Sequence, residues 1–141
     1  MKSSFRFLAT TTLALIAAPL FAAEHPDTKG WKDLFSADLS NSVEAGKWAM
    51  KDGTLVAGDH ETLWTKDSYG DFILDLEFKV EKEANSGVFL RCGDIKNILS
   101  ALEIQVHENT DGSRIGMVGG IYDALKPSKE MAKPAGEWNH F

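Results

Sequence analysis

Apolar and polar residues alternate over two long stretches of the chain. In residues 71–80 every second side chain is apolar, and only Ile73 breaks the polar series between them. Residues 101–107 alternate again, and their apolar positions are Leu102, Ile104 and Val106. A period of two places successive side chains on opposite faces of a strand. Both stretches are therefore predicted to be strands of an antiparallel sheet with one buried face.

Shorter apolar runs separated by turn residues extend this pattern. Asp52-Gly53 lies between two such runs and predicts a tight hairpin over residues 48–56, because this dipeptide accepts positive φ angles. Further short strands are expected at residues 31–35, 62–65 and 88–92, and only residues 95–101 and 123–132 are suited to a helical turn. Many strands and little helix predict an all-β sandwich or jelly roll of antiparallel strands.

The first 23 residues are typical of a secretory signal peptide. Lys2 and Arg6 precede an apolar stretch, and small residues at Ala22 and Ala23 suit a signal peptidase. The apolar run is short for a membrane span, and no cysteine stands at the cleavage point to carry a lipid. We therefore expect cleavage near Ala22 or Ala23, a secreted or periplasmic bacterial protein, and one domain over residues 24–141.

Charge and cysteine content narrow the classes of partner. The 141 residues carry 15 basic and 21 acidic side chains, a formal net charge of −6, and loss of Lys2 and Arg6 with the signal leaves −8. An acidic chain without a basic cluster does not favour nucleic acid or an anionic membrane surface as a partner. The single cysteine, Cys92, is interpreted as a small half-buried residue and not as a catalytic thiol.

The candidate chemistry lies on the polar sides of the predicted strands. If these polar sides share one sheet face, they offer carboxylates, amides, an imidazole and a guanidinium to a hydroxyl-rich ligand. Tyr122 adds an aromatic ring on which a sugar can stack. Alternating charges on an antiparallel strand are also what a solvated face looks like, and that interpretation stays open for each of them. The polar positions are Glu77 on the first strand, Asn85 and Arg91 on the second, and Glu103, Gln105 and His107 on the third.

An ordered set of short segments resembles a known family. They run in order from residue 30 to the end of the chain, and the most specific are the strand that begins Asn85-Ser86-Gly87 and the later Glu103-Ile104-Gln105. This set resembles the 3-keto-disaccharide hydrolase domain family. The full set is Gly30-Trp31-Lys32-Asp33-Leu34-Phe35, Trp64-Thr65, Tyr69-Gly70-Asp71-Phe72, Leu76-Glu77-Phe78, Asn85-Ser86-Gly87-Val88-Phe89-Leu90-Arg91, Glu103-Ile104-Gln105 and Lys133-Pro134-Ala135-Gly136-Glu137-Trp138-Asn139.

The resemblance implies a concanavalin-like jelly roll and cleavage of sugars that are oxidised at the 3-hydroxyl. A ketone at carbon 3 acidifies the hydrogen on carbon 2, so a general base can remove it and expel the group on carbon 1. In this hypothesis Glu103 is the base, Arg91 and Gln105 hold the keto or enediolate oxygen, and Glu77 is a second acid. Asn85 and Tyr122 bind the sugar. His107 is an acid or base, or with Glu103 a ligand of a divalent metal, although the ligand spacing lends this metal no support.

Two other functions stay open. A β-glucanase on a similar jelly roll would use Glu-x-Asp with a further glutamate, and here Gln105 replaces the aspartate while Glu108 has an odd offset. A carbohydrate-binding module without catalysis would use the same polar sides with Tyr122 and exposed tryptophans. The apolar run at residues 138–141 ends where relatives enter further strands, so we expect a chain truncated at its C-terminus, with an incomplete sandwich.

Overall fold

The computed structural model describes residues 29–59, 61–107 and 117–141, and the predicted signal peptide lies outside them. The chain divides into two compact units, residues 1–34 and residues 35–141. Of the first unit, the described residues form a turn at Lys29 and Gly30 and then irregular backbone. The strand expected at residues 31–35 is therefore wrong, and Trp31 and Leu34 are each 37% exposed. All that follows concerns the second unit.

The second unit is all-β over its described residues, with a single short helical turn. The strands are β1 (Ala49–Lys51), β2 (Thr54–Val56), β3 (Glu77–Phe78), β4 (Asn85–Leu90), β5 (Leu102–His107) and β6 (Asn139–His140). The 3-10 helix η1 (Ile98–Ser100) lies inside one of the two ranges predicted for a helical turn, and residues 123–132 have none. All strand pairs are antiparallel, namely β1 with β2, β3 with β6, and β4 with β5. The predicted all-β class of antiparallel strands is confirmed.

The β1–β2 hairpin follows from its turn residues. Asp52 and Gly53 have φ angles of 49° and 76°, as a two-residue turn between antiparallel strands requires. Lys51 and Thr54 consequently face each other across the turn. The predicted hairpin is confirmed, whereas residues 62–65 form only an isolated bridge between Thr65 and Ser42.

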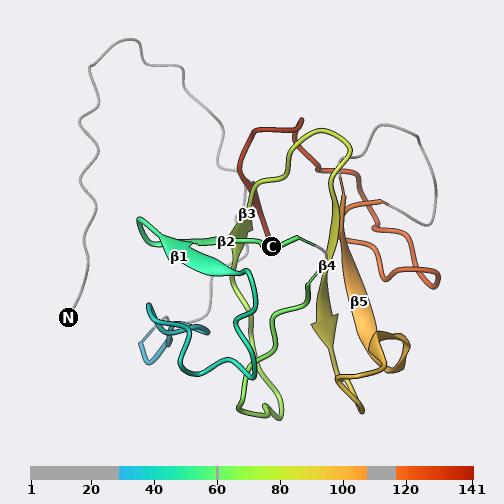
Figure 1. Cartoon of the computed structure of the whole chain (residues 1–141). Helices are drawn as coiled ribbons and strands as arrows, with labels where there is room; N and C mark the ends of the chain where they lie inside the picture. Colours follow the sequence, from blue (N-terminus) through green and yellow to red (C-terminus); the bar gives the residue numbers. More distant parts are fainter. Residues whose placement is uncertain (1–28, 60, 108–116) are drawn as a thin grey trace. The chain divides into compact units, whose positions relative to one another are not determined.

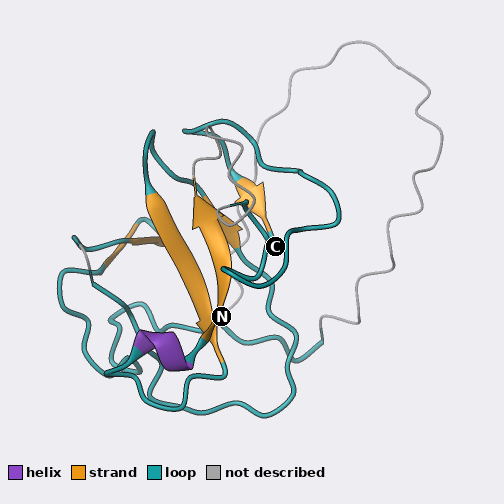
Figure 2. Ribbon diagram, turned by 90° about the vertical axis from the view of Figure 1, so that its right-hand side faces the viewer, coloured by secondary structure: helices purple, strands orange, loops and turns teal. Residues whose placement is uncertain are grey.

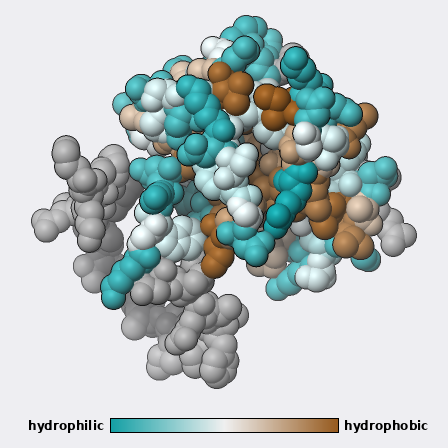
Figure 3. Space-filling view, turned by 90° about the horizontal axis from the view of Figure 1, so that it is seen from below, coloured by the Kyte–Doolittle hydropathy of each residue, from teal (hydrophilic) through white to brown (hydrophobic). Residues whose placement is uncertain are grey.

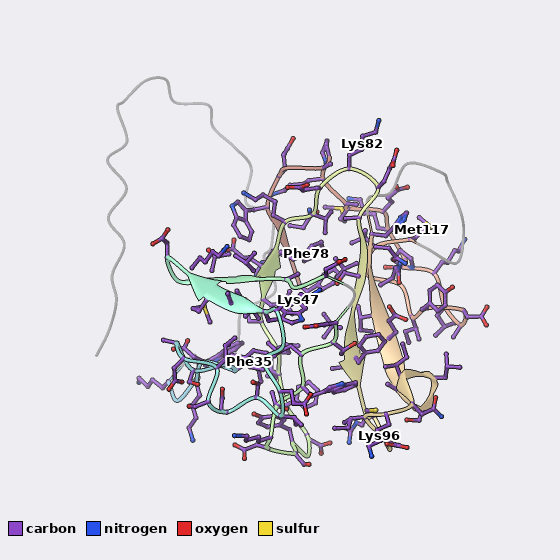
Figure 4. All side chains as sticks on the ribbon, in the orientation of Figure 1. Phe35, Lys47, Phe78, Lys82, Lys96 and Met117 are labelled. Atoms are coloured by element: carbon purple, nitrogen blue, oxygen red, sulfur yellow. The ribbon has the colours of Figure 1, made fainter. Side chains whose placement is uncertain are left out.

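β4 and β5 are the longest strands and lie side by side along their whole length, as Figures 1 and 2 show. Their register pairs Asn85 with His107 at one end and Leu90 with Leu102 at the other. Figure 4 marks Lys82 and Lys96 in the loops that flank β4, at opposite ends of the strand. A further segment lies on the other edge of β5, where Ile121 pairs with Ile104.

β4 ends earlier than the pattern of apolar residues predicted. The strand was expected to open with Asn85-Ser86-Gly87 and to continue over residues 88–92, and it occupies Asn85–Leu90. Arg91 has a φ of 55°, which a strand residue does not adopt, so the period of two stops before it. The guanidinium of Arg91 is consequently not placed by the register of the sheet.

Residues 71–80 form much less sheet than their pattern predicted. Only Glu77 and Phe78 are strand, because the partner β6 provides only Asn139 and His140. Leu76 extends the pairing through two backbone hydrogen bonds with Phe141 of 2.9 and 3.0 Å. Burial still alternates as predicted: the apolar positions 74, 76, 78 and 80 are half-buried, and the polar positions 75, 77 and 79 are exposed.

The core of the described chain is small. Three apolar side chains of this part are buried, Leu39, Val106 and Val118, at 5–9% exposure. Many large apolar side chains remain accessible, up to Leu99 at 90%, and Figure 3 shows such brown atoms at the surface among hydrophilic ones. Figure 4 shows Phe78 turned toward the interior of the unit, where its ring lies 4.7 Å from that of Phe141. The strands therefore have few fully buried contacts to hold them together.

Candidate functional site

One face of the β4–β5 ladder gathers most of the predicted site residues. Residues that face each other across an antiparallel pair project to the same side of the sheet. The register pairs Asn85 with His107, Gly87 with Gln105, and Phe89 with Glu103. The expectation that the polar sides of these two strands coincide is thus confirmed. We call the six residues of this side, together with Tyr122, the polar face.

Tyr122 joins the polar face from the other edge of β5. Ile121 pairs with Ile104, and the backbone N–H of Tyr122 donates to the carbonyl of Glu103 at 2.9 Å. This register places Tyr122 beside Glu103, opposite the side on which Phe89 stands. The ring is 49% exposed, so it is open to a ligand. The sequence alone did not show that Tyr122 and Glu103 are neighbours, because the two residues are 19 positions apart in the chain.

Glu103 is a carboxylate that the fold partly withdraws from water. Its side chain lies over Gly87, diagonally across the ladder, where an alanine Cβ would come within 2.7 Å of its Cγ and 2.8 Å of its Cδ. Phe89 stands directly opposite, and its ring packs against Trp64 with 5.9 Å between centroids. Burial raises the pKa of the Glu103 carboxyl above its ordinary 4.5, because a low-dielectric environment disfavours the charged form.

Gln105 is buried at 2% exposure, which the sequence did not predict. Its Nε2 donates a 2.7 Å hydrogen bond to Oδ1 of Asn85, the exposed residue at the start of β4. Its Oε1, like Nδ1 of His107, is a buried polar atom without a hydrogen-bond partner among the described residues. Gln105 was expected to touch the sugar, but its burial limits direct contact with a ligand. Of the three predicted sugar-binding residues, Asn85 and Tyr122 are exposed, whereas Gln105 is buried.

Two of the predicted catalytic residues lie elsewhere. Glu77 is exposed on β3, which pairs with β6 and has no described pairing with β4 or β5. Arg91 lies beyond the end of β4, and its guanidinium bonds to the Asp71 carboxylate at 3.2 Å. The described pairings do not bring Glu77 onto the polar face, and the positive φ at Arg91 ends the alternation that was expected to place Arg91 there.

Two further expectations concern a metal site at His107 and Glu103 and the glucanase pattern. Within the described residues no three His, Cys, Asp or Glu side chains are grouped as a metal site would require, so His107 and Glu103 gain no third ligand. Glu108, needed for the glucanase pattern, lies outside the described residues.

Cys92 is half-buried, and its Sγ lies 3.5 Å from Oγ of Ser100. No helix in the described part is long and apolar enough to cross a bilayer.

Sequence reasoning missed the part that Gly87 and Trp64 play in the surroundings of Glu103. In the sequence both residues stood out only as parts of the ordered segments Asn85-Ser86-Gly87 and Trp64-Thr65, and neither was predicted to be a site residue. A glycine inside a strand was the available signal, since it often marks a close approach by another group. The contact between Trp64 and Phe89 joins segments 25 positions apart in the sequence, and no local pattern reports it.

Comparison with known proteins places the chain in a family. It is 27% identical over 163 aligned positions to a 3-keto-disaccharide hydrolase of Bacteroides thetaiotaomicron, covering 89% of this chain and 56% of the relative. A crystal structure of a protein from Parabacteroides distasonis assigned as a glycosyl hydrolase superposes with a TM-score of 0.73. That protein is 37% identical, and the match covers 78% of this chain and 60% of its own. The chain thus spans somewhat more than half the length of each.

The family match extends over nearly the whole chain. Residues 19–141 match the 3-keto-alpha-glucoside-1,2-lyase-like domain. The matched range includes every strand described above and the entire polar face. The family expected from the short ordered segments is therefore confirmed, and the chain belongs to the 3-keto-alpha-glucoside-1,2-lyase-like domain family.

Proposed function

We propose that this chain is a carbohydrate-active enzyme that cleaves the glycosidic bond of 3-keto-glycosides, with Glu103 as its general base. The single observation that carries the proposal is the position of the Glu103 carboxyl, held over Gly87 and beside Phe89 on the polar face. The raised pKa brings a carboxyl closer to the range in which it exchanges protons efficiently. The family, and the hydrolase names of both relatives, support a carbohydrate substrate.

The reaction follows from the chemistry of the substrate. The Glu103 carboxylate removes the proton from carbon 2, which the neighbouring ketone acidifies, and the electron pair passes into an enediolate. The bond from carbon 1 to the glycosidic oxygen then breaks, and the leaving group takes up a proton. Water adds to the resulting double bond, with its hydroxyl on carbon 1 and a proton returned to carbon 2. The net change is hydrolysis.

Other residues of the polar face have supporting parts in this proposal. Tyr122 stands beside Glu103 with an exposed ring, which suits stacking on the apolar side of a sugar. Asn85 binds sugar hydroxyls through its side-chain amide, and Gln105 holds that amide in place through the 2.7 Å hydrogen bond. No stabiliser of the enediolate oxygen is assigned, because Arg91 is bonded to Asp71 and Gln105 is buried.

The experiment compares a 3-keto-glucoside that carries deuterium at carbon 2 with its protium form and with the parent glucoside. We expect turnover of the keto sugar only, a slower rate for the deuterated form, and solvent hydrogen at carbon 2 of the product. Turnover without an isotope effect or exchange would favour direct hydrolysis. Binding of these sugars without turnover would identify a carbohydrate-binding module instead, and neither binding nor turnover would refute the proposed substrate class.

A further inference from the structure

Gly87 stands in the middle of β4 without a backbone reason to be glycine. The described glycines with positive φ are Gly30, Gly46, Gly53, Gly119 and Gly136, and Gly87 is not among them. Its backbone is that of a regular strand residue, paired with Gln105. Glycine in a strand interior loses conformational entropy and contributes no packing, so its presence asks for another reason.

The reason lies in the space over Gly87. Glu103 faces Phe89, which makes Gly87 its diagonal neighbour across the ladder, within reach of a long side chain. The side chain of Glu103 fills the place that a Cβ at position 87 would need, and its Oε1 comes closest. The conflict is with the mobile end of a side chain. At Gly120, by contrast, a Cβ would meet carbonyl oxygens of Leu125 and Met117 at 2.9 and 3.1 Å, which cannot move without the backbone.

We propose that Gly87 is a positioning residue, whose missing side chain lets the Glu103 carboxylate lie against β4 beside Phe89. A side chain at position 87 would lift the carboxylate away from the sheet and into water. The surroundings of the carboxylate would then lose the apolar contact that removes it from solvent. The catalytic consequence rests on the proposed function, whereas the placement of the carboxylate does not.

Two independent features of the site agree with this role. Phe89 stands opposite Glu103 on the same side of the ladder and packs against Trp64, so a carboxylate held down over Gly87 is next to the apolar ring of Phe89. Burial raises the pKa of the Glu103 carboxyl, as expected for a group that is partly withdrawn from water. The other titratable side chains placed on this face by the register are His107 on β5 and Tyr122 on the neighbouring segment.

The test is the titration of Glu103 in the full chain and in Gly87→Ala. Carboxyl carbons of labelled glutamate are followed by NMR, and the Glu103 resonance is identified by its absence in Glu103→Gln. We expect the pKa of Glu103 to fall toward its ordinary value in Gly87→Ala. Gly93→Ala is the matched control, because Gly93 also lacks a positive φ and has open space where a Cβ would stand. It should leave the titration unchanged.

Activity gives a second readout. Displacing a catalytic group by about 1 Å can cost about 100-fold in rate, so kcat for the 3-keto-glucoside should fall by about tenfold or more in Gly87→Ala while KM changes little. An unchanged Glu103 titration in Gly87→Ala would overturn the positioning role. A shifted titration in a chain that never turns over the keto sugar would preserve the positioning role and refute the proposed function.

A double variant covers the case in which Gly87→Ala does not fold. In Glu103→Ala the obstructing side chain is gone, so adding Gly87→Ala should not lower the melting temperature. If the alanine at position 87 unfolds the chain equally with and without Glu103, the backbone itself requires glycine and the proposal is wrong. If it is harmful only when Glu103 is present, the conflict is with that side chain, as proposed.

Discussion

The ladders β4–β5 and β3–β6 start from similar sequence patterns and end as different surfaces. Both alternate apolar and polar residues and carry a glutamate on the polar side. β4 and β5 pair over six positions, and the polar face between them contains the buried Gln105 and the partly buried Glu103. β3 and β6 pair over two positions, and their polar side is exposed at Glu77 and at the preceding Asp75.

Two properties distinguish the ladders: the number of residues that pair between the two strands, and the side chains that lie opposite each glutamate. Together they decide whether the polar side of a strand can form a functional site. Glu103 has a glycine diagonally opposite, over which its side chain lies, and a phenylalanine directly opposite. Glu77 faces His140, whose ring nitrogen bonds to Asp75 at 2.8 Å, so its surroundings are charged and hydrated. Two glutamates at equivalent positions in the alternation thus differ in the chemistry they can support.

The largest expected effect separates these two glutamates by activity. Glu103→Gln should lower kcat for the 3-keto-glucoside by about 10²- to 10⁴-fold, because the amide cannot accept the proton from carbon 2. Glu77→Gln should lower it far less, since the exposed Glu77 belongs to the other ladder. The measurement is steady-state turnover of both variants beside the parent chain. Equal losses in both would restore Glu77 as the second acid, and intact turnover in Glu103→Gln would remove Glu103 as the base.

The next prediction tests the same comparison by stability. Val106→Ala should lower the free energy of unfolding by about 2 kcal/mol, because Val106 is 5% exposed on the apolar side of β5 and its loss leaves a cavity. Ile73→Ala is the matched control from the segment that leads to β3. Ile73 is 64% exposed, so a change within about 0.5 kcal/mol is expected. Urea unfolding of both variants measures the difference, and equal losses would mean that the β4–β5 ladder does not hold the core.

Much of this contrast follows from local sequence, and the rest depends on distant contacts. The alternation over 101–107 predicted β5 correctly, because a period of two and its apolar side are local properties. Asp52-Gly53 likewise predicted the hairpin from two residues. The shared face of Glu103, Gln105 and His107 was predicted for the same reason, since it needs only the strand itself.

The failures share a cause that lies outside the local window. Residues 71–80 were predicted as one long strand, but strand formation needs a partner, and β6 pairs with only two of them. Arg91 was placed on the face by counting, and the positive φ that ends β4 just before it breaks the count. The burial of Gln105 depends on tertiary packing and on its bond to Asn85, 20 positions away. The alternation of residues indicates which side of a strand is polar, whereas tertiary packing decides whether that side is shielded from water.

A smaller loss of stability is expected when the hydrogen bond between Gln105 and Asn85 on the polar face is removed. Asn85→Ala removes the acceptor at 2.7 Å from Nε2 of the buried Gln105, which should cost about 1–2 kcal/mol of unfolding free energy. Asn85→Asp keeps an acceptor oxygen at the same position and should recover part of the loss. Chemical denaturation of the two variants is the measurement. If alanine and aspartate behave alike, the hydrogen bond contributes nothing to the stability of this ladder.

The smallest expected effect is a pH dependence of stability, and its sign distinguishes burial of a carboxylate from its hydrogen bonding. Burial raises the pKa of Glu103 in the folded chain above its ordinary 4.5, so the folded state holds more protons than the unfolded state between these two values. Stability therefore falls as the pH rises through that window, and the penalty is fully present above the raised pKa. Glu103→Gln removes the charge, so the variant should gain stability over the parent at neutral pH and not at pH 3.

Asp38 provides the control of opposite sign. Hydrogen bonds from Ser40, chiefly from its backbone N–H at 3.0 Å, lower the pKa of this aspartate from 3.8 to about 2. The charged form is thus favoured in the folded chain, and its stabilisation is present above pH 3.8 and lost as the pH falls toward 2. Asp38→Asn should consequently lose stability at neutral pH, where Glu103→Gln gains it. Thermal unfolding of both variants between pH 3 and 7 compares them, and a loss in Glu103→Gln at neutral pH would show that the polar face stabilises its carboxylate better than water does.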